Sequence, residues 1–440
     1  MTEINPKQDE ISLEPYWYNT HSRPFSRNQS IAPDLDLLIV GAGYTGLSAA
    51  CVAHDLGAKT AVVDAREAGN GASTRNGGMF GAHPKLSWDE LSKKFNSETA
   101  DKIFSEASEA LYFVKDLIKR EEISCDLKQT GRIQLAWTEK DFESQKQLVL
   151  AIKSKSNVDV AILKRHELKH EINTNRYYGA ILFKEHCAID PAKFHSGLTS
   201  SVLSRNIPII ENSPVISIIK EPGGHRVLFS EQDIFVKKVI MATNGYTAND
   251  FSWFKRRVVP IPSYIIATED LPSDLIQRLA PGGRMMVETR AKNSYFRISP
   301  NGKKIIFGGR AAMKPIPLEI AAKRLKSSLE DIWPELNGCK LTHAWTGNTG
   351  YSFNHAPHVG THKGIFYAMG FSGSGTVLAP YLGAKVAYHA LEDSRGKTAY
   401  SKTVLKTSPL HFLKKPYFLS LVDFWFRNFI DSYQNRLKRK

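Results

Sequence analysis

Cysteine is scarce in this sequence, and its spacing argues against several kinds of site. The chain has four cysteines, far apart and without any C-x-x-C pair: Cys51, Cys125, Cys187 and Cys339. A disulfide framework, a zinc site or an iron–sulfur cluster needs more cysteines or closer spacing than this. We therefore expect free thiols in the core or at the surface, and no metal site.

Long apolar runs are missing from the first thirty residues, which are polar and carry Glu3, Lys7, Asp9, Glu10 and Glu14. Neither a secretory signal nor a membrane anchor is expected there, so a cytoplasmic location is the default. The chain also lacks internal repeats and low-complexity tracts. Its 440 residues exceed one compact core, and two domains, interleaved in sequence, are expected.

Acidic residues are outnumbered, with 44 Asp and Glu against 59 Lys and Arg, which gives a net charge of +15. About half of this excess lies from Lys397 onward, where ten basic residues are opposed only by Asp423 and Asp431. A basic tail of this kind is more typical of a solvated surface than of a polyanion site. No nucleic-acid partner is predicted.

The chain does contain a glycine-rich turn directly after a short apolar strand. Residues 37–40 lead into Gly41-x-Gly43-x-x-Gly46, and the pattern that follows predicts a helix from Leu47 to Leu56. In this spacing the first glycine allows the tight turn, the second lets a pyrophosphate approach, and the third lets the helix pack on the strand. The helix N-terminus then directs N–H groups at the phosphates.

A second strand, Thr60–Val63, ends in Asp64, whose carboxylate is placed to bind ribose hydroxyls. Both NAD(P) and FAD bind such a unit. Asp64 would repel the 2′-phosphate of NADP. Glycine-rich junctions recur at 73–78, 243–245 and 370–375. An extended cofactor that is buried along most of its length explains this recurrence, so the pattern favours FAD.

The remaining pattern alternates helices with extended runs. Helices are predicted over 98–122, 139–153, 190–205, 318–332 and 376–391, and most of 258–309 is extended, with turn signals between the runs. Asp190-Pro191 is a helix start, with an N-cap aspartate and proline at the first position. This arrangement predicts a chain of mixed helices and strands with an additional sheet in 258–309.

These motifs together resemble the FAD-dependent D-amino-acid oxidase / sarcosine oxidase / glycine oxidase superfamily, and within it the γ-glutamylputrescine oxidoreductase-like branch. The resemblance extends from about Ser12 to Glu392 and is carried by the combination of short motifs. These are the 41–46 cradle with Asp64, Gly71–Gly78, Asp190-Pro191, Ala242–Tyr246, Gly308–Arg310, Trp345-x-Gly347, Gly370–Gly375 and an N-terminal Tyr16-Trp17.

The resemblance implies a Rossmann-like FAD-binding domain (α/β) interleaved with an antiparallel-sheet substrate domain (α+β). Residues 1–34 are an N-terminal extension in this division, and 396–440 form a basic, aromatic C-terminal helical segment. The FAD-binding domain is expected to comprise 35–88, 185–257 and 335–395, and the substrate domain 89–184 and 258–334.

Cofactor-binding residues follow from the same resemblance. They are Gly41, Gly43, Tyr44, Thr45, Gly46, Asp64, Ala65, Ser73, Thr74, Arg75, Asn76, Gly77, Gly78, Val215, Thr243, Asn244, Gly245, Gly347, Gly370, Gly373, Ser374, Gly375 and Thr376. Some sarcosine-type members bind flavin through a cysteine near the Trp345-x-Gly347 motif, where this chain has none. Noncovalent FAD is therefore expected.

The implied reaction oxidises the C–N bond of an amine or N-substituted amino acid. Hydride passes to flavin, the imine hydrolyses, and O2 reoxidises the flavin to give H2O2. Arg75, His83 and Arg310 are the catalytic candidates, while Tyr264, Tyr295, Arg297, Trp345 and Phe371 are candidates for the substrate pocket. Two alternatives stay open, a membrane-associated dehydrogenase that reduces quinone and a flavoprotein that acts on tRNA.

The C-terminal segment allows two interpretations. Residues 412–430 are apolar and aromatic, and a basic stretch, 436–440, follows. A basic amphipathic helix could lie on a membrane surface, as would suit a quinone-reducing enzyme. We favour the plainer interpretation, a helix packed on the FAD-binding domain. The oligomeric state stays open.

Overall fold

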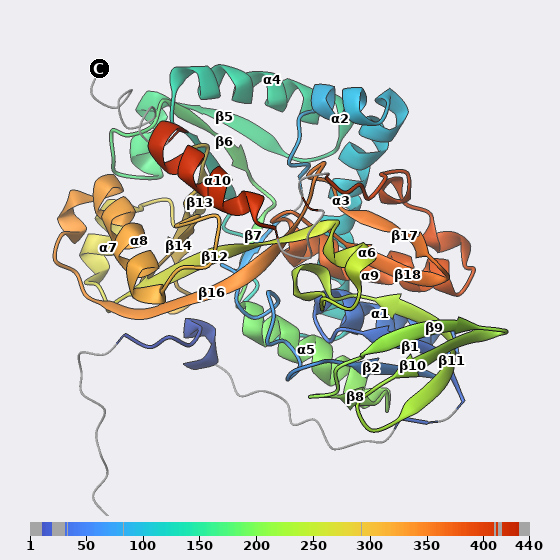
Figure 1. The fold of residues 1–440 in the computed structure, drawn as a ribbon. Coiled ribbons are helices and arrows are strands. Elements are labelled where there is room, and N and C mark those ends of the chain that lie inside the picture. Colours follow the sequence, from blue (N-terminus) through green and yellow to red (C-terminus); the bar gives the residue numbers. More distant parts are fainter. Residues whose placement is uncertain are drawn as a thin grey trace, which may run out of the picture.

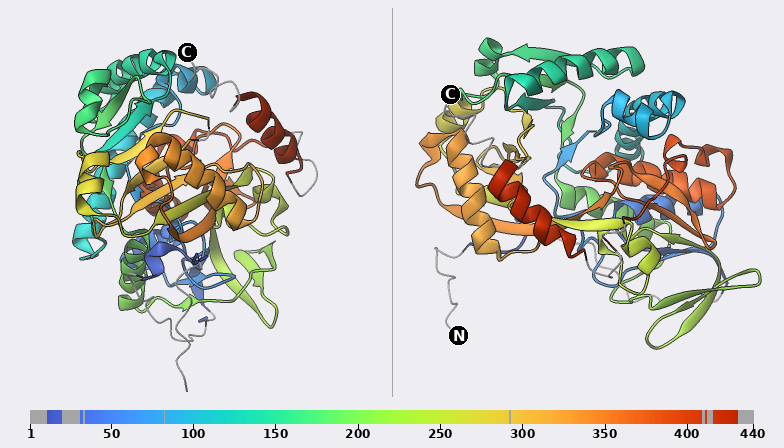
Figure 2. Two further views of the ribbon diagram at one scale, coloured as in Figure 1. Left: turned by 90° about the vertical axis from the view of Figure 1, so that its left-hand side faces the viewer. Right: turned by 45° about the horizontal axis from the view of Figure 1, so that its top comes forward.

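The computed structural model describes residues 11–19, 31–32, 34–81, 83–291, 293–408, 411 and 416–430. It has two bodies, each built around a large sheet (Figures 1 and 2).

The first sheet is mainly parallel and has the strand order β17-β18-β11-β1-β2-β8, with the β9–β10 hairpin joined to β11. β1 pairs in parallel with β2 and β11, and the edge strand β17 is antiparallel to β18. The strands are β1 (Leu35–Val40), β2 (Thr60–Val63), β8 (Ile209–Ile210), β9 (Ser217–Glu221), β10 (Gly224–Leu228), β11 (Asp233–Met241), β17 (His358–His362) and β18 (Ile365–Met369).

The second sheet has the order β16-β12-β15-β14-β13-β4-β6-β5. Its pairs are antiparallel, as the resemblance implied, except β4–β13, which is parallel. The strands are β4 (Arg132–Ala136), β5 (Val160–Lys164), β6 (Gly179–Phe183), β12 (Val258–Thr268), β13 (Met285–Glu288), β14 (Tyr295–Ile298), β15 (Ile305–Gly309) and β16 (Leu341–Ser352).

The helices lie around these sheets, and the short pair β3 (Met79–Phe80) and β7 (Cys187–Ala188) forms a third, two-stranded sheet. The helices are α1 (Tyr44–Asp55), α2 (Trp88–Lys94), α3 (Ser97–Arg120), α4 (Glu139–Lys155), α5 (Pro191–Ser204), α6 (Ser252–Lys255), α7 (Ser273–Leu279), α8 (Leu318–Ile332), α9 (Gly375–Ala390) and α10 (Phe418–Trp425). Among the described residues, no helix is both long and apolar enough to cross a membrane.

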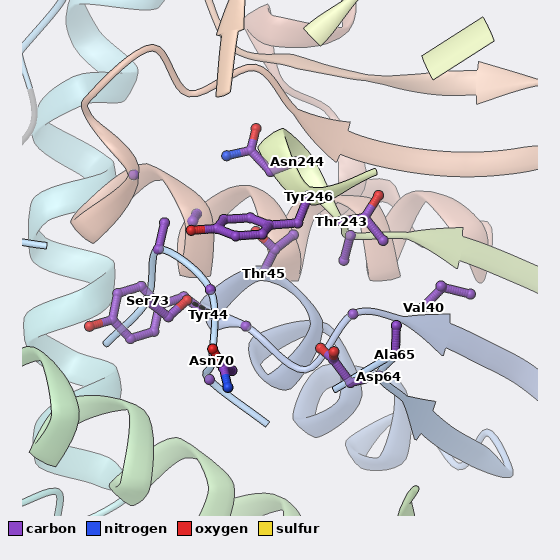
Figure 3. A pocket seen from close by; sticks show the side chains of 18 of the residues that line it. Val40, Tyr44, Thr45, Asp64, Ala65, Asn70, Ser73, Thr243, Asn244 and Tyr246 are labelled. Atoms are coloured by element: carbon purple, nitrogen blue, oxygen red, sulfur yellow. Dashed lines mark hydrogen bonds between the residues drawn. The ribbon is translucent and has the colours of Figure 1, made fainter. Parts of the chain in front are cut away.

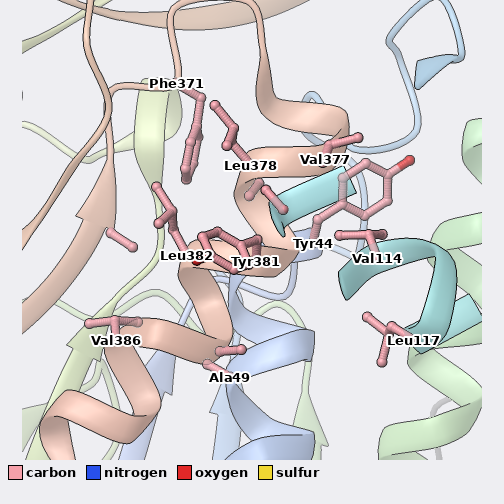
Figure 4. Packing of buried hydrophobic residues seen from close by; sticks show 14 of the residues in the cluster. Tyr44, Ala49, Val114, Leu117, Phe371, Val377, Leu378, Tyr381, Leu382 and Val386 are labelled. Carbon is pink, nitrogen blue, oxygen red and sulfur yellow. The ribbon is translucent and has the colours of Figure 1, made fainter. Parts of the chain in front are cut away.

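Two segments fall on the other side of the predicted division. β16 lies within 335–395, yet it pairs with β12 from Ser352 to Leu341 and so belongs to the second sheet. α3 lies within 89–184, yet its apolar face joins the core cluster of α1 and α9, where Val114 and Leu117 face Tyr44 and Tyr381 (Figure 4). Contacts between distant segments of the chain determine to which body β16 and α3 belong. Local sequence patterns do not show such contacts.

The C-terminal helix also differs from our expectation. Asp423 of α10 accepts a hydrogen bond from the Met313 N–H at 2.8 Å, and the Phe426 ring lies near the Arg310 guanidinium. Both partners follow β15 in the chain. α10 therefore packs on the second body, not on the first (Figure 2).

Candidate functional site

The turn between β1 and α1 has the close packing that its glycines predict. Gly41 has a φ of +113°, and a Cβ there would meet the Ala242 carbonyl oxygen at 2.9 Å. A Cβ on Gly46 would collide with the Gly41 carbonyl, which lets α1 lie tightly on the strand. Gly43 caps the helix without a side chain to accept from its first-turn N–H groups. That turn of α1 therefore starts at an open space.

This space is a cavity that extends along the carboxyl ends of the first sheet (Figure 3). Many of the predicted cofactor residues line it. They are Gly41, Gly43, Tyr44, Thr45, Asp64, Ala65, Ser73, Asn76, Val215, Thr243, Asn244, Gly373, Gly375 and Thr376.

Asp64 marks one end of the cavity. One carboxylate oxygen accepts the Ala42 N–H at 2.8 Å, and the other accepts the Arg66 N–H at 3.0 Å. Burial raises the pKa of Asp64, although these two N–H donors oppose the shift. Each oxygen retains a lone pair for a further donor. Ser213, Pro214 and Val215 close the cavity beside it.

The loop 69–78 forms the middle of the cavity wall. Ser73 Oγ accepts the Tyr44 N–H at 3.0 Å, which links the loop to the start of α1. Asn76 holds the loop in shape, since its amide donates to the carbonyls of Ala72 and Ser73 and its Oδ1 accepts the Gly78 N–H. The loop is thus an ordered wall and not a free surface segment.

The N-terminus of a second helix, α9, meets the far end of the cavity. Gly373, with a φ of +100°, lines it together with Gly375, Thr376 and Phe371. α9 packs against α1, where a Cβ on Gly383 would collide with the Thr45 carbonyl. The Asn244 side chain accepts the Gly370 N–H at 2.9 Å and so ties this turn to the end of β11.

The donor chemistry of this cavity fits a dinucleotide. A carboxylate stands at one end, a helix N-terminus without a side-chain cap stands next to it, and a second helix N-terminus stands at the far end. Helix N-termini bind anionic groups through free N–H donors and the helix dipole. A single Rossmann unit supplies only the first of these helix N-termini, and the second suits a longer cofactor.

Comparison with known proteins supports this interpretation. The model of the DAO family, described as FAD dependent oxidoreductase, matches residues 36–389. The chain belongs to the DAO family. The prediction of an FAD-dependent enzyme of this superfamily is thereby confirmed, as is its reaction class, oxidoreduction at CH–NH groups.

Relatives and solved structures agree with this assignment. The chain is 27% identical over 366 residues to the γ-glutamylputrescine oxidoreductase of Escherichia coli, covering 82% of this chain and 84% of that one. It is 26% identical over 394 residues to the probable oxidoreductase OrdL of Haemophilus influenzae, covering 86% and 90%. Its fold is similar to that of glycine oxidase from Geobacillus kaustophilus, with a TM-score of 0.70, 17% identity and coverage of 86% and 99%.

The other predicted cofactor residues of this DAO-family chain lie outside the lining of the cavity. Thr74 is buried, and its hydroxyl donates to the Gly69 carbonyl at 2.6 Å. The Arg75 guanidinium points away, to the carbonyls of Asn70 and Thr346. The residues in this position are Gly46, Thr74, Arg75, Gly77, Gly78, Gly245, Gly347, Gly370 and Ser374.

The predicted substrate residues are dispersed, and of the five only Phe371 lines the cavity. Tyr264 is buried among the apolar side chains of the second body, and its hydroxyl oxygen accepts the Ile316 N–H. Trp345 is fully buried and donates to the Arg75 carbonyl at 3.0 Å. These two residues pack the structure and do not form the wall that we expected.

Arg297 and Tyr295 act as contacts between the two bodies. The Arg297 guanidinium donates to the carbonyls of Gly78 at 2.9 Å and Ile189 at 2.7 Å, so it is neither an ordinary surface ion pair nor open to a carboxylate. The Tyr295 hydroxyl pairs with Ser263, and burial raises the pKa of Tyr295 to about 12. Its ring lies against Gly77, where a Cβ would clash.

The predicted catalytic histidine is not among the residues that line the cavity. His83 Nδ1 lies 2.6 Å from Nη2 of Arg132, and its ring packs on Phe183. Burial, assisted by the charges of Arg132 and Lys85, lowers the pKa of His83 well below its ordinary value. His83 is therefore neutral at pH 7, but the structure does not bring it to the cofactor space.

Sequence reasoning missed Lys85 and Tyr351, which form a polar cluster with the predicted Arg310 beside the second helix N-terminus. Lys85 Nζ donates to the Tyr351 hydroxyl at 3.0 Å and to the Ser372 carbonyl at 3.1 Å. Burial raises the pKa of Tyr351, but Lys85 and Arg310 outweigh it, so that the pKa falls below its ordinary value. Arg310 thus stands near this tyrosine. Lys85 and Tyr351 are 266 positions apart in the sequence, so no local sequence pattern indicates their contact.

Proposed function

We propose that this enzyme oxidises the C–N bond of an amine that carries a carboxylate, such as γ-glutamylputrescine or an N-substituted amino acid. The observation that carries the proposal is the Lys85–Tyr351–Arg310 cluster beside Gly373, at the end of the cavity opposite Asp64. A Cβ on Gly373 would lie 3.6 Å from the Tyr351 hydroxyl, so the cluster adjoins the cavity wall. Two cations near one hydroxyl offer charge-assisted donors to a substrate anion.

The residues that line the cavity have complementary roles in this proposal. When FAD is bound, Asp64 would accept hydrogen bonds from the ribose hydroxyls, the first turn of α1 would bind the pyrophosphate, and Gly373 to Thr376 would direct backbone donors at the pyrimidine end of the flavin. Bound FAD supplies the two-electron chemistry by accepting hydride from the substrate carbon. Noncovalent binding is supported because all four cysteines are described and none lines the cavity.

The protein's own residues contribute mainly by positioning the substrate. An amine must be neutral to release hydride, because an ammonium has no lone pair to stabilise the forming imine. Lys85 and Arg310 would hold the carboxylate at the other end of the substrate, which would fix the reacting carbon against the flavin. Imine hydrolysis and reoxidation by O2, giving H2O2, complete the proposed cycle.

The test is anaerobic bleaching of the flavin absorbance in the holoenzyme. γ-Glutamylputrescine and its α-carboxamide form a matched pair, because they differ only at the carboxylate. We expect bleaching by γ-glutamylputrescine and much slower bleaching by its α-carboxamide. Equal bleaching rates would show that the substrate carboxylate has no role in the reaction. The proposal would be overturned if dithionite reduced the flavin but no amine or N-substituted amino acid in a broad panel bleached it.

A dehydrogenase that passes electrons to quinone is the second candidate. The exposed aromatic face of α10 favours it, because Phe424 and Trp425 are each more than half exposed and would suit contact with a quinone-bearing membrane. H2O2 release under air, measured against reduction of a quinone analogue, separates the two acceptors. Rapid H2O2 formation at each turnover excludes the dehydrogenase.

A further inference from the structure

The two faces of α10 differ sharply in exposure. Leu419 and Asp423 face the second body and are buried, and Asp423 is held by the Met313 N–H. On the outer face, Leu421 is 75% exposed, Phe424 57% and Trp425 56%. These three lie at i, i+3 and i+4, which places them side by side on one stripe of the helix.

The apolar surface continues on both sides of α10. Tyr417 precedes the helix and is 62% exposed, while Phe429 follows it and is 51% exposed. The Phe429 ring stacks on Trp425 with ring centroids 4.6 Å apart. Soluble proteins seldom expose a contiguous patch of large apolar side chains without a partner for it. The other large exposed apolar residues of the described chain, such as Leu150, are scattered over other elements.

The sequence around this patch is strongly basic. Lys414 and Lys415 precede the helix, Arg427 follows it, and Arg436, Lys438, Arg439 and Lys440 end the chain. Only Asp423 and Asp431 oppose them, and Asp423 points inward to Met313. The combination of aromatic and leucine side chains with flanking cations matches a helix that lies in the headgroup region of a negatively charged bilayer.

We propose that the exposed face of α10, from Tyr417 to Phe429, docks this enzyme on an anionic membrane surface. The helix of eight residues, Phe418–Trp425, is far too short to span a bilayer, so it lies parallel to the surface. A second copy of the chain is a poorer occupant, because each copy carries a net charge of +15 and the two basic segments would repel. The proposal does not depend on which amine is oxidised.

Docking through α10 would place the membrane surface over a cavity of the second body. The inner side of α10 lines a cavity through Asp423 and Phe426, together with Arg310, Met313 and Arg324. Arg310 also contributes to the polar cluster around Tyr351. This cavity therefore lies directly beneath the docked helix.

The test is co-sedimentation of the full-length holoenzyme with phosphatidylcholine vesicles, with and without phosphatidylglycerol. We expect binding to the anionic vesicles at low salt, and about tenfold weaker binding to phosphatidylcholine alone. The combined substitution Leu421→Ser, Phe424→Ser and Trp425→Ser should abolish binding. The matched control Leu150→Ser, which removes a side chain that is 62% exposed on α4, should leave it unchanged. Both variants should retain turnover of a soluble amine.

Two further measurements keep the proposal open to refutation. The tryptophan fluorescence should shift to the blue with anionic vesicles, and Trp425→Phe should remove that shift. The substitutions Lys438→Glu, Arg439→Glu and Lys440→Glu should weaken binding, as added salt should. Three results would each overturn the membrane assignment. The first is absence of binding, and the second is binding that the Leu421, Phe424 and Trp425 triple variant retains. The third is a dimer, seen by light scattering, that this same variant dissociates. The last result would identify a second copy as the occupant.

Discussion

The indole N–H of Trp17 donates a hydrogen bond to the carbonyl of Asn76 at 2.9 Å. Trp17 is fully buried, and its ring meets Trp345 edge-on, with centroids 6.3 Å apart. Trp345 in turn donates to the preceding carbonyl, that of Arg75. Two indoles from opposite ends of the chain thus hold successive peptide groups of the loop that forms the middle of the cavity wall.

The first prediction concerns this contact. Trp17→Phe retains most of the packing but removes the donor, which leaves a carbonyl of the loop unsatisfied. We expect a loss of about 1 kcal/mol in FAD binding, or roughly a fivefold weaker affinity. Fluorescence titration of the apoprotein with FAD measures it. Trp88→Phe is the control, since that indole donates to Asp101 away from the cavity. Equal effects of the two variants would show that the loss is only general destabilisation.

The second prediction concerns the helix cap. A Cβ on Gly43 would lie 2.9 Å from Ser73 Oγ, the atom that accepts the Tyr44 N–H. Gly43→Ala should therefore displace the loop from the start of α1 and weaken FAD binding by about tenfold or more. Gly57→Asn is a suitable control, because this position has open space and asparagine tolerates its positive φ. FAD retention through gel filtration gives the comparison. Normal retention by Gly43→Ala would contradict a phosphate site at this turn.

The parts of the site that the sequence predicted are those built by local geometry. Gly41, Gly43 and Asp64 lie within one βαβ unit, where the spacing of residues determines where they meet. Lys85 and Tyr351 meet only because the two bodies pack together, and the two indoles meet because the N-terminal segment packs on the second sheet. β16 is similar: no strand was predicted over its residues, and its partner, β12, is distant in the chain. The candidates Tyr264 and Trp345 were placed by residue type alone, and both are packing residues.

The third prediction tests the polar cluster. Lys85→Met removes a cation next to Tyr351, so the pKa of Tyr351 should rise, because its phenolate loses a stabilising charge. If Tyr351 must stay protonated for turnover, the alkaline limb of the pH profile of kcat/KM shifts upward. KM for a carboxylated amine should also increase by roughly tenfold, while kcat changes less. Lys119→Met, on the exposed side of α3, is the control. An unchanged KM would exclude Lys85 from substrate binding.

The last prediction concerns stability at acidic pH. His358 is fully buried, with Nδ1 next to the Thr403 carbonyl and Nε2 next to the Asn354 side chain. Burial lowers the pKa of His358 to about 4, although the Thr403 contact opposes the shift. The unfolded chain, with an ordinary histidine pKa near 6.5, then binds more protons than the folded chain between these values.

The free energy of unfolding should therefore decrease as the pH falls from about 6.5 to about 4, by roughly 1 kcal/mol per pH unit for this residue. His358→Gln removes the titrating group while keeping a hydrogen-bonding side chain. Urea unfolding at neutral and mildly acidic pH should show a smaller acid loss in this variant than in the parent chain. The exposed His54→Gln variant should keep the parent's pH dependence. Identical slopes in all three proteins would mean that other groups, such as His343, whose pKa burial also lowers to about 4, dominate the acid transition.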